Sequence, residues 1–178
     1  MADAAVPAPP FNDVCATDFL GFEFNARSYN DQLQAAIART ETVCAMSAEV
    51  VRVGNTDTVW MKHDFKFLGG SLGCAEGEVL CRGFEFARQH RLPVVVVCQS
   101  GGARMQEGTL SLMQLGKVSV CVESHKAAGL PFVCVLKDPT YGGVPASYAM
   151  QADVRIGIQG GRIGESDGRG TATCGVIG

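Results

Sequence analysis

The chain has 178 residues, of which 47% are hydrophobic and 19% are charged, and its formal net charge is −3. This length supports one sizeable core, and the slightly acidic balance excludes the basic surface that nucleic-acid-binding proteins need. The longest uninterrupted apolar run, residues 94–98, is far shorter than the roughly 20 residues that span a bilayer. We therefore expect no nucleic-acid partner and no membrane span.

The N-terminal sequence MADAAVPAPPFND contains no Lys or Arg, so it predicts neither a signal peptide nor a transit peptide. We expect a cytoplasmic protein, or one of an organelle matrix or stroma if the source is eukaryotic. Eight cysteines are present without any C-x-x-C pair, and Cys98 and Cys134 lie in apolar runs typical of small buried side chains. This pattern favours reduced thiols and predicts no metal site.

In chain order, residues 1–23 are expected to form a flexible arm, because Ala and Pro dominate their first half. Residues 29–40 carry apolar side chains at helical spacing, and Ser28 or Asn30 can cap that helix. Two β-like stretches follow, residues 42–53 and 58–67, with a Gly54-Asn55 turn signal between them. These stretches predict a hairpin.

Beyond the hairpin, strand and helix patterns alternate. Such alternation predicts parallel strands joined by right-handed crossovers, hence the α/β class. The short β-branched runs are typical of strands buried on both faces. The predicted elements are a helix at 72–90, a strand at 93–98, a helix at 105–128, a strand at 132–136, a short helix at 145–152 and a strand at 154–158.

Two glycine-rich turns follow these predicted strands, one at residues 99–104 and one at 138–143. Each turn leads into a helix, so each can offer backbone N–H groups to a negative charge. Both lie at the carboxyl edge of a parallel sheet, where ligands bind in open α/β folds. The alternative is that each glycine pair only makes a tight turn.

Other chemistries have weaker signals. Neither a P-loop nor a G-x-G-x-x-G fingerprint is present. Ser147 opens a helix as a nucleophile could, but His63, His90 and His125 offer it no obvious base. Several carboxylates lie near helix starts, where an acid is more often a dipole partner or cap than a catalytic base. These carboxylates are Glu76, Glu78, Glu107 and Asp138.

One long resemblance stands out. The string SGGARMQEGTLSLMQ from residue 100, with GLPFVCVLKDPTYGGVPASYAM at residues 129–150, resembles the β subunit of acetyl-CoA carboxylase carboxyltransferase, a biotin-dependent carboxyltransferase. FKFLGGSLG from residue 65 and the 29–40 helix are also similar to that family. The likeness covers residues 24–164, which we take as one carboxyltransferase domain.

The resemblance implies a ClpP/crotonase-like superhelix of β-β-α units, here C-terminally incomplete. It implies transfer of carboxylate from carboxybiotin to acetyl-CoA to form malonyl-CoA for fatty acid synthesis. The biotin is carried by a separate biotin carboxyl carrier protein, and a carboxyltransferase α-type subunit supplies the other half of the site. The acyl substrate is a CoA thioester, and this chemistry requires no metal.

The resemblance also implies site residues. Gly101 and Gly102 are expected to be catalytic, because their turn forms the oxyanion hole for the biotin oxygen. The thioester and pantetheine are expected to contact the neighbouring turns, with Lys or Arg reserved for the phosphates. The predicted substrate-binding residues are Gly69, Gly70, Ser71, Arg104, Tyr141, Gly142 and Gly143.

Two departures from the family pattern leave alternatives open. Cys15 is the single cysteine before residue 24, where the family commonly has a four-cysteine zinc ribbon, and residues 165–178 form a divergent tail that reads as loop. The chain could therefore be a non-catalytic structural or regulatory subunit with the same fold, or another crotonase-type acyl-CoA enzyme. An unfinished last layer would also leave residues 154–158 for a partner to cover.

Overall fold

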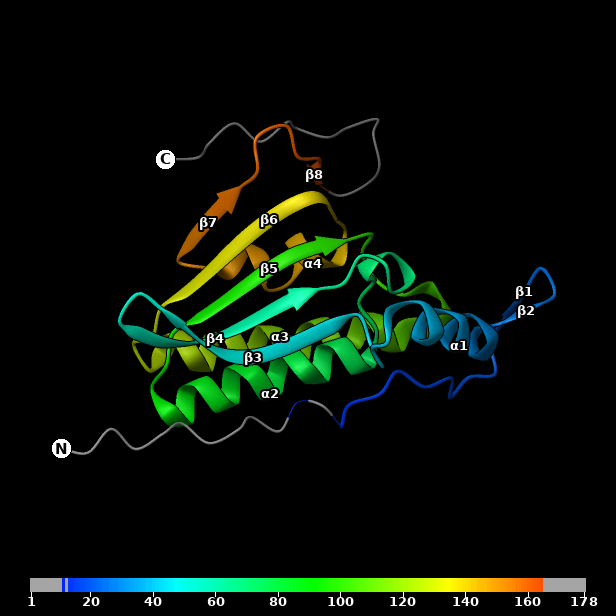
Figure 1. Ribbon diagram of the computed structural model, residues 1–178, viewed down its shortest axis with the longest axis horizontal. Helices are drawn as coiled ribbons and strands as arrows, with labels where there is room; N and C mark the ends of the chain where they lie inside the picture. Colours follow the sequence, from blue (N-terminus) through cyan, green and yellow to red (C-terminus); the bar gives the residue numbers. More distant parts are fainter. Residues whose placement is uncertain (1–10, 12, 165–178) are drawn as a thin grey trace.

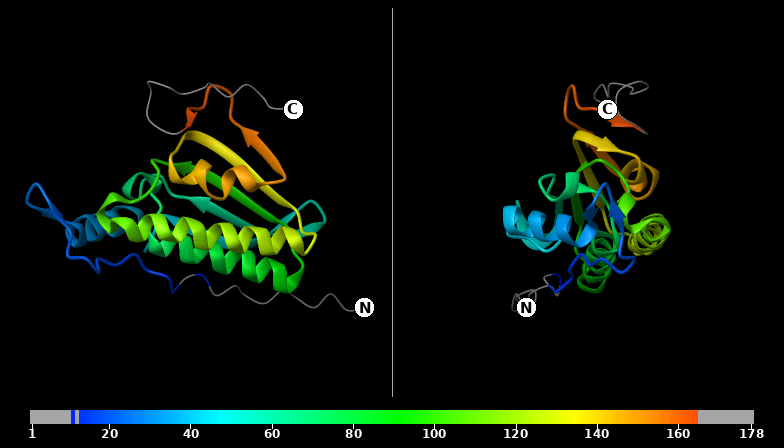
Figure 2. Two further views of the ribbon diagram at one scale, coloured as in Figure 1. Left: turned by 180° about the vertical axis from the view of Figure 1, so that it is seen from behind. Right: turned by 90° about the vertical axis from the view of Figure 1, so that its right-hand side faces the viewer.

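A six-stranded sheet carries two long helices side by side along one of its faces (Figures 1 and 2). The computed structural model describes residues 11 and 13–164. No helix in this part of the chain is long and apolar enough to cross a membrane. The strands are β1 (Glu23–Phe24), β2 (Arg27–Ser28), β3 (Met46–Val53), β4 (Thr56–His63), β5 (Val94–Ser100), β6 (Phe132–Tyr141), β7 (Val154–Gly157) and β8 (Ile163–Gly164). The helices are α1 (Tyr29–Thr40), α2 (Cys74–His90), α3 (Thr109–Ala127) and α4 (Gly143–Ala146), with 3₁₀ turns η1 (Leu68–Gly70), η2 (Met105–Glu107) and η3 (Ala149–Gln151).

The sheet order is β3-β4-β5-β6-β7, and β8 adds to the end of β6. Strands β3 and β4 form the predicted antiparallel hairpin, whereas β4, β5, β6 and β7 are parallel. Helices α2 and α3 are the crossovers between the parallel strands. The α/β class and the hairpin-then-helix order are therefore confirmed, and the carboxyl ends of β4, β5 and β6 meet at one edge.

Local chemistry explains where the elements begin and end. Helix α1 starts at the predicted cap, since the Ser28 hydroxyl accepts a hydrogen bond from the Asp31 N–H at 3.0 Å. Helix α3 begins at Thr109, four residues later than predicted, because Gly108 has a positive φ of 55° and separates α3 from η2. The predicted 145–152 helix is divided into α4 and η3, since Ser147 has non-helical backbone angles. Strand β6 extends five residues beyond its predicted end, to Tyr141.

Part of the predicted flexible arm packs on the domain. Phe11 is 3% exposed and contacts the Phe86 ring edge-to-face at a centroid distance of 5.7 Å. Val14 and Ala16 are also buried. The expectation of a flexible arm is therefore wrong for this stretch, because its apolar side chains are part of the hydrophobic core. Residues 1–10 and 12, and the predicted tail at 165–178, lie outside the described residues.

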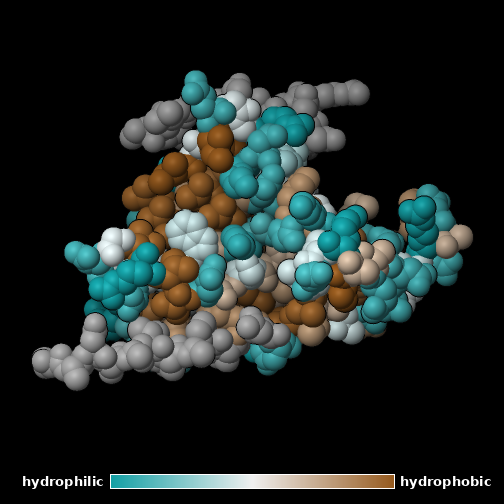
Figure 3. Space-filling view, in the orientation of Figure 1, coloured by the Kyte–Doolittle hydropathy of each residue, from teal (hydrophilic) through white to brown (hydrophobic). Residues whose placement is uncertain are grey.

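The two faces of the parallel strands differ in burial. Cys98 and Cys134 lie on the helix-covered face and are fully buried, as predicted, with their sulfur atoms 3.3 Å apart. On the opposite face, β5 and β6 carry alternating valines that are only half-buried, and Ile156 of β7 is 51% exposed. Figure 3 shows hydrophobic surface in this region. In the part of the chain that the structure describes, the prediction that these strands are buried on both faces is therefore wrong.

Candidate functional site

The turns after β4 and β5 are joined by backbone hydrogen bonds. The Gly101 N–H donates to the Gly69 carbonyl at 2.9 Å, and the Leu72 N–H donates to the Gly102 carbonyl at 2.8 Å. Gly70 has a positive φ of 62°, and a Cβ there would lie 2.2 Å from the Gln99 carbonyl oxygen. Only glycine permits this approach. The 69–71 turn is therefore fixed against the end of β5.

The turn after β6 closes on the same point. Gly102 has a φ of 108°, and a Cβ on it would lie 3.5 Å from the Tyr141 carbonyl oxygen and 3.7 Å from the Gly143 nitrogen. A Cβ on Gly143 would lie 3.5 Å from the Ala103 nitrogen. The structure thus brings the three predicted glycine turns together at the carboxyl edge of the sheet. We call this meeting point, residues 69–71, 100–104 and 141–143, the turn junction.

The N–H groups at the turn junction are not equally available. Those of Gly101 and Gly142 donate to backbone carbonyls, and that of Gly102 donates to the Ser100 hydroxyl at 3.1 Å. Among the residues that the structure describes, the N–H groups of Gly69, Ala103 and Gly143 have no acceptor, and the last two belong to the turns after β5 and β6. The Ala103 and Gly143 amides can therefore meet an anionic oxygen without breaking an internal bond. Ala103 was not among the predicted site residues, because the donor role was assigned to the glycines.

The side chain of Arg104, a predicted substrate contact, is buried beneath the turn junction instead. It is 0% exposed and forms ion pairs with Glu76 at 2.7 Å and with Glu107 at 3.5 Å. Its Nε and Nη2 atoms donate to the hydroxyl and the carbonyl of Ser71 at 3.0 and 2.6 Å. The prediction that Arg104 contacts substrate is wrong, because every direction around the guanidinium is occupied by the chain itself.

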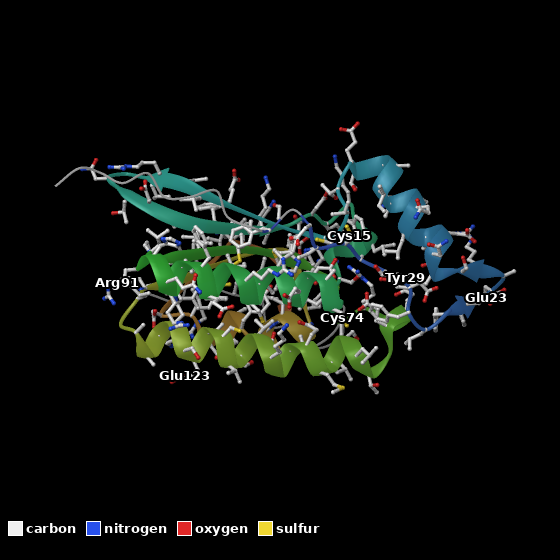
Figure 4. The ribbon with its side chains drawn as sticks, turned by 90° about the horizontal axis from the view of Figure 1, so that it is seen from below. Cys15, Glu23, Tyr29, Cys74, Arg91 and Glu123 are labelled. Atoms are coloured by element: carbon white, nitrogen blue, oxygen red, sulfur yellow. The ribbon has the colours of Figure 1, made fainter. Side chains whose placement is uncertain are left out.

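The carboxylates of this cluster act at the start of helix α2. Glu76 accepts from the Gly73 N–H at 2.9 Å, and Glu107 accepts from the Cys74 N–H at 2.6 Å. This confirms the interpretation of Glu76 as a helix-start partner, whereas Glu107 serves the start of α2 and not that of the helix predicted at 105–128. Figure 4 shows Cys74 at the same end of the molecule as Tyr29, whose hydroxyl donates to Glu107. The N-terminus of α2 is therefore closed to external anions.

Burial and charge have opposite effects on Arg104. Burial alone disfavours the charged guanidinium, but the Glu76 carboxylate and the Tyr29 hydroxyl raise the pKa of Arg104 above its ordinary value. The charge is therefore permanent. One buried cation is held among two carboxylates, and this polar cluster supports the turn junction from below.

A second buried polar group connects the first turn with the segment after the third. The His63 Nδ1 atom is 2.8 Å from the Gly70 carbonyl oxygen, and its Nε2 atom is 2.6 Å from the Tyr148 hydroxyl. A carbonyl can only accept, so the proton resides on Nδ1 and Nε2 accepts from Tyr148. Burial lowers the pKa of His63 to about 4, although the bond to Gly70 opposes that shift. The imidazole is therefore neutral at physiological pH.

This histidine makes stability depend on pH. In the unfolded chain its pKa is near 6.5, so the unfolded state binds the proton first as pH falls. The contribution of neutral His63 to the free energy of unfolding is complete above pH 6.5, and it decreases by roughly 3 kcal/mol in total as the pH falls toward 4. Urea unfolding at several pH values should show this slope in the wild type and in His90→Asn. A His63→Asn variant that kept the slope would contradict the assignment.

The remaining candidates have structural partners. The Ser147 hydroxyl donates to the Gly143 carbonyl at 2.5 Å, and His63 faces Tyr148 instead, so no nucleophile–base pair forms here. Asp138 pairs with Arg162 at 2.9 Å, and that hydrogen bond lowers the pKa of Asp138. No group of three metal-ligating side chains occurs among the residues described by the structure. The turn junction remains the one chemical candidate that the sequence and this geometry share.

Comparison with known proteins decides the family. The sequence-family model of the carboxyl transferase domain matches residues 20–158 of this chain. This chain belongs to the carboxyl transferase domain family. It is 48% identical over 153 residues to the acetyl-coenzyme A carboxylase carboxyl transferase subunit beta of Chelativorans sp. (strain BNC1), covering 86% of this chain and 50% of that protein. The corresponding subunit of Crocosphaera subtropica is 44% identical over 156 residues, covering 87% and 49%.

Solved structures agree with the fold. The match to a Pseudomonas malonate decarboxylase hetero-tetramer in complex with malonate has a TM-score of 0.63 at 20% identity and covers 68% of this chain and 46% of that one. The match to transcarboxylase 12S, with hydrolysed methylmalonyl-coenzyme A bound, has a TM-score of 0.61 at 26% identity and covers 67% and 23%. The crotonase-like fold of this carboxyl transferase domain is therefore confirmed. The chain spans about half the length of the curated relatives that it matches.

Proposed function

We propose that this carboxyl transferase chain contributes the β-type half of a site that transfers carboxylate from carboxybiotin to acetyl-CoA, forming malonyl-CoA for fatty acid synthesis. The observation that carries the proposal is the turn junction, where three glycine turns converge and the N–H groups of Ala103 and Gly143 remain available. The matched relatives bear the name of this subunit over most of the present chain. They favour neither a non-catalytic subunit nor another acyl-CoA enzyme.

The chemistry fits backbone donors. Carboxyl transfer places negative charge on an oxygen of each substrate, and fixed N–H groups stabilise such charge without reorganising. The Ala103 and Gly143 amides, which the Gly101–Gly102 turn holds in place, provide such donors for the biotin oxygen. A carboxyltransferase α-type subunit provides the corresponding donors for the thioester oxygen. The biotin arrives on a separate carrier protein, as a substrate.

The proposal is tested with the complex. The chain is co-expressed with an α-type subunit, and malonyl-CoA-dependent carboxylation of free biotin is measured for the complex and for each subunit alone. Transfer that requires both subunits supports the proposal. A correctly assembled complex without transfer would refute it.

The acyl-CoA substrate is expected to contact backbone groups first. Turns 69–71 and 141–144 flank the available amides, so the thioester and pantetheine should lie along them, with the phosphates on Lys or Arg side chains. Titration of acetyl-CoA into the isotope-labelled complex should therefore shift the amide resonances of Ser71 and Gly142 before those of α3. Shifts confined to residues 162–178 would contradict this placement.

Assembly with a partner follows from the uncovered strand β7. Val154 and Ile156 are each 51% exposed and Ile158 is 44% exposed, on the sheet face whose valines are half-buried. Large exposed apolar patches are uncommon on monomers and mark interaction sites. We propose that the α-type subunit covers this region, so the isolated chain should self-associate at micromolar concentration. Sedimentation velocity checks this, and a monodisperse monomer with a cooperative melt would contradict it.

A further inference from the structure

Every N–H group of the Arg104 guanidinium has a partner. The Nε atom donates to Ser71, and Nη2 donates to Ser71 and to Glu76. The Nη1 atom donates to the Tyr29 hydroxyl at 3.2 Å and to Glu107 at 3.5 Å. The fork geometry of arginine makes five such bonds possible, and a lysine ammonium offers only three donors from one point. No other side-chain type can satisfy this set of acceptors.

The acceptors belong to segments far apart in sequence. Tyr29 is the first residue of α1, and Ser71 lies in the turn after β4. Glu76 also accepts from the N–H of Ala45, just before β3, at 2.7 Å. Arg104 itself ends the turn after β5. Directly or through Glu76, the Arg104 side chain therefore fixes the starts of α1 and α2 and the segment before β3. It also connects the glycine turns after β4 and β5.

The backbone of Arg104 connects this cluster to the available donor. Its N–H donates to the Leu72 carbonyl at 2.8 Å, and the preceding residue, Ala103, pairs with Leu72 as an isolated parallel bridge. The Ala103 N–H shares its peptide unit with the Gly102 carbonyl, which accepts from the Leu72 N–H at 2.8 Å, so the two bonds to Leu72 on either side of Ala103 fix the position of this amide. The guanidinium resists a shift of this turn, because its carboxylate partners are 0% and 1% exposed and would be left unpaired.

We infer that Arg104 is a positioning residue, which holds the Ala103 amide at the turn junction through its buried bonds to Ser71, Glu76, Glu107 and Tyr29. This inference rests on the proposed carboxyl transfer for its kinetic consequence. Its structural consequence can be measured without any substrate.

The test compares three variants of the chain in its complex with the α-type subunit. Arg104→Lys keeps the charge but loses the fork, and Tyr29→Phe removes one hydroxyl while keeping the ring. Phe132→Leu is the control, since Phe132 is fully buried at the opposite end of β6 and contacts Phe84. It lowers stability without touching the cluster.

For Arg104→Lys we expect kcat to fall about 100-fold, on the scale of a lost oxyanion donor, while KM for acetyl-CoA changes less than threefold. Tyr29→Phe should lower kcat about fivefold, and Phe132→Leu should leave it within twofold. Wild-type kcat in both cluster variants, or an equal loss in Phe132→Leu, would overturn the inference.

Amide hydrogen exchange separates this inference from the proposed function. In Tyr29→Phe and Arg104→Lys, the amides of Leu72, Gly101 and Arg104 should exchange at least tenfold faster, whereas those of β6 and α3 should not. This result would support the positioning role even if the wild-type complex showed no carboxyl transfer. Unchanged exchange at the three turn amides would refute it, whatever the activity.

Discussion

Replacing Gly102 with valine should reduce carboxyl transfer by roughly 100-fold or more, on the scale of a lost oxyanion-hole donor. The φ of 108° at Gly102 is one that side chains with a Cβ rarely adopt, so the turn must rearrange. A Cβ there would also face the Tyr141 carbonyl and the Gly143 amide, so branched methyl groups would occupy the place of the substrate oxygen. The measurement is malonyl-CoA-dependent carboxylation of biotin by the complex.

Gly54→Val is the matched control. Gly54 also has a positive φ, of 59°, and a Cβ there meets nothing within 4 Å in the hairpin turn. This variant also places a Cβ on a residue with positive φ, but far from the turn junction, so its transfer rate should remain near that of the wild type. Equal rates for the two variants would show that the Gly102 turn has no part in catalysis.

Replacing Glu76 with glutamine should lower the free energy of unfolding by about 3 kcal/mol. The two Glu76 oxygens accept from Arg104 and from the N–H groups of Ala45 and Gly73, all in a fully buried place. A glutamine amide turns one of these acceptors into a donor, so a buried N–H loses its partner. Urea unfolding of the purified chain or complex measures the change.

Glu78→Gln provides the same chemical change two residues along the same helix. The Glu78 side chain is one-third exposed and pairs with Arg82 and Lys117 near the surface. Surface pairs contribute at most about 1 kcal/mol, so this control should unfold close to the wild type. If both variants lost the same stability, the buried cluster would not be the support described above.

The sequence predicted most of the fold because periodicity and turn chemistry are local. The hairpin, the crossover helices and the cap at Ser28 could all be read from neighbouring residues. The boundaries that were wrong depend on single backbone angles: the positive φ of Gly108 delays α3, and the geometry of Ser147 divides the last predicted helix. The packing of Phe11 on Phe86 joins residues 75 positions apart, and no local pattern indicates it.

The location of the site could be predicted from the sequence, but the amides that remain available there could not. Glycine pairs indicated which turns meet, yet bonds between the turns determine which amides remain available. Those bonds, such as the one from Gly101 to Gly69, cannot be seen in either segment alone. Arg104 was misassigned for a related reason. An arginine beside a glycine turn is typical of anion binding, and only the three-dimensional placement of Glu76 and Glu107 shows that its charge is already matched.

The parallel order of β4, β5, β6 and β7 has a consequence for how the chain folds. Each strand can pair with the previous one only after an intervening segment has crossed over, so the stabilising contacts are distant in sequence and form slowly. Until then the valine run of β5 is an unpaired, β-prone segment. The turn junction needs the ends of three such strands, so it can form only after these long-range pairings. Newly made chains are therefore most exposed to aggregation before their site exists.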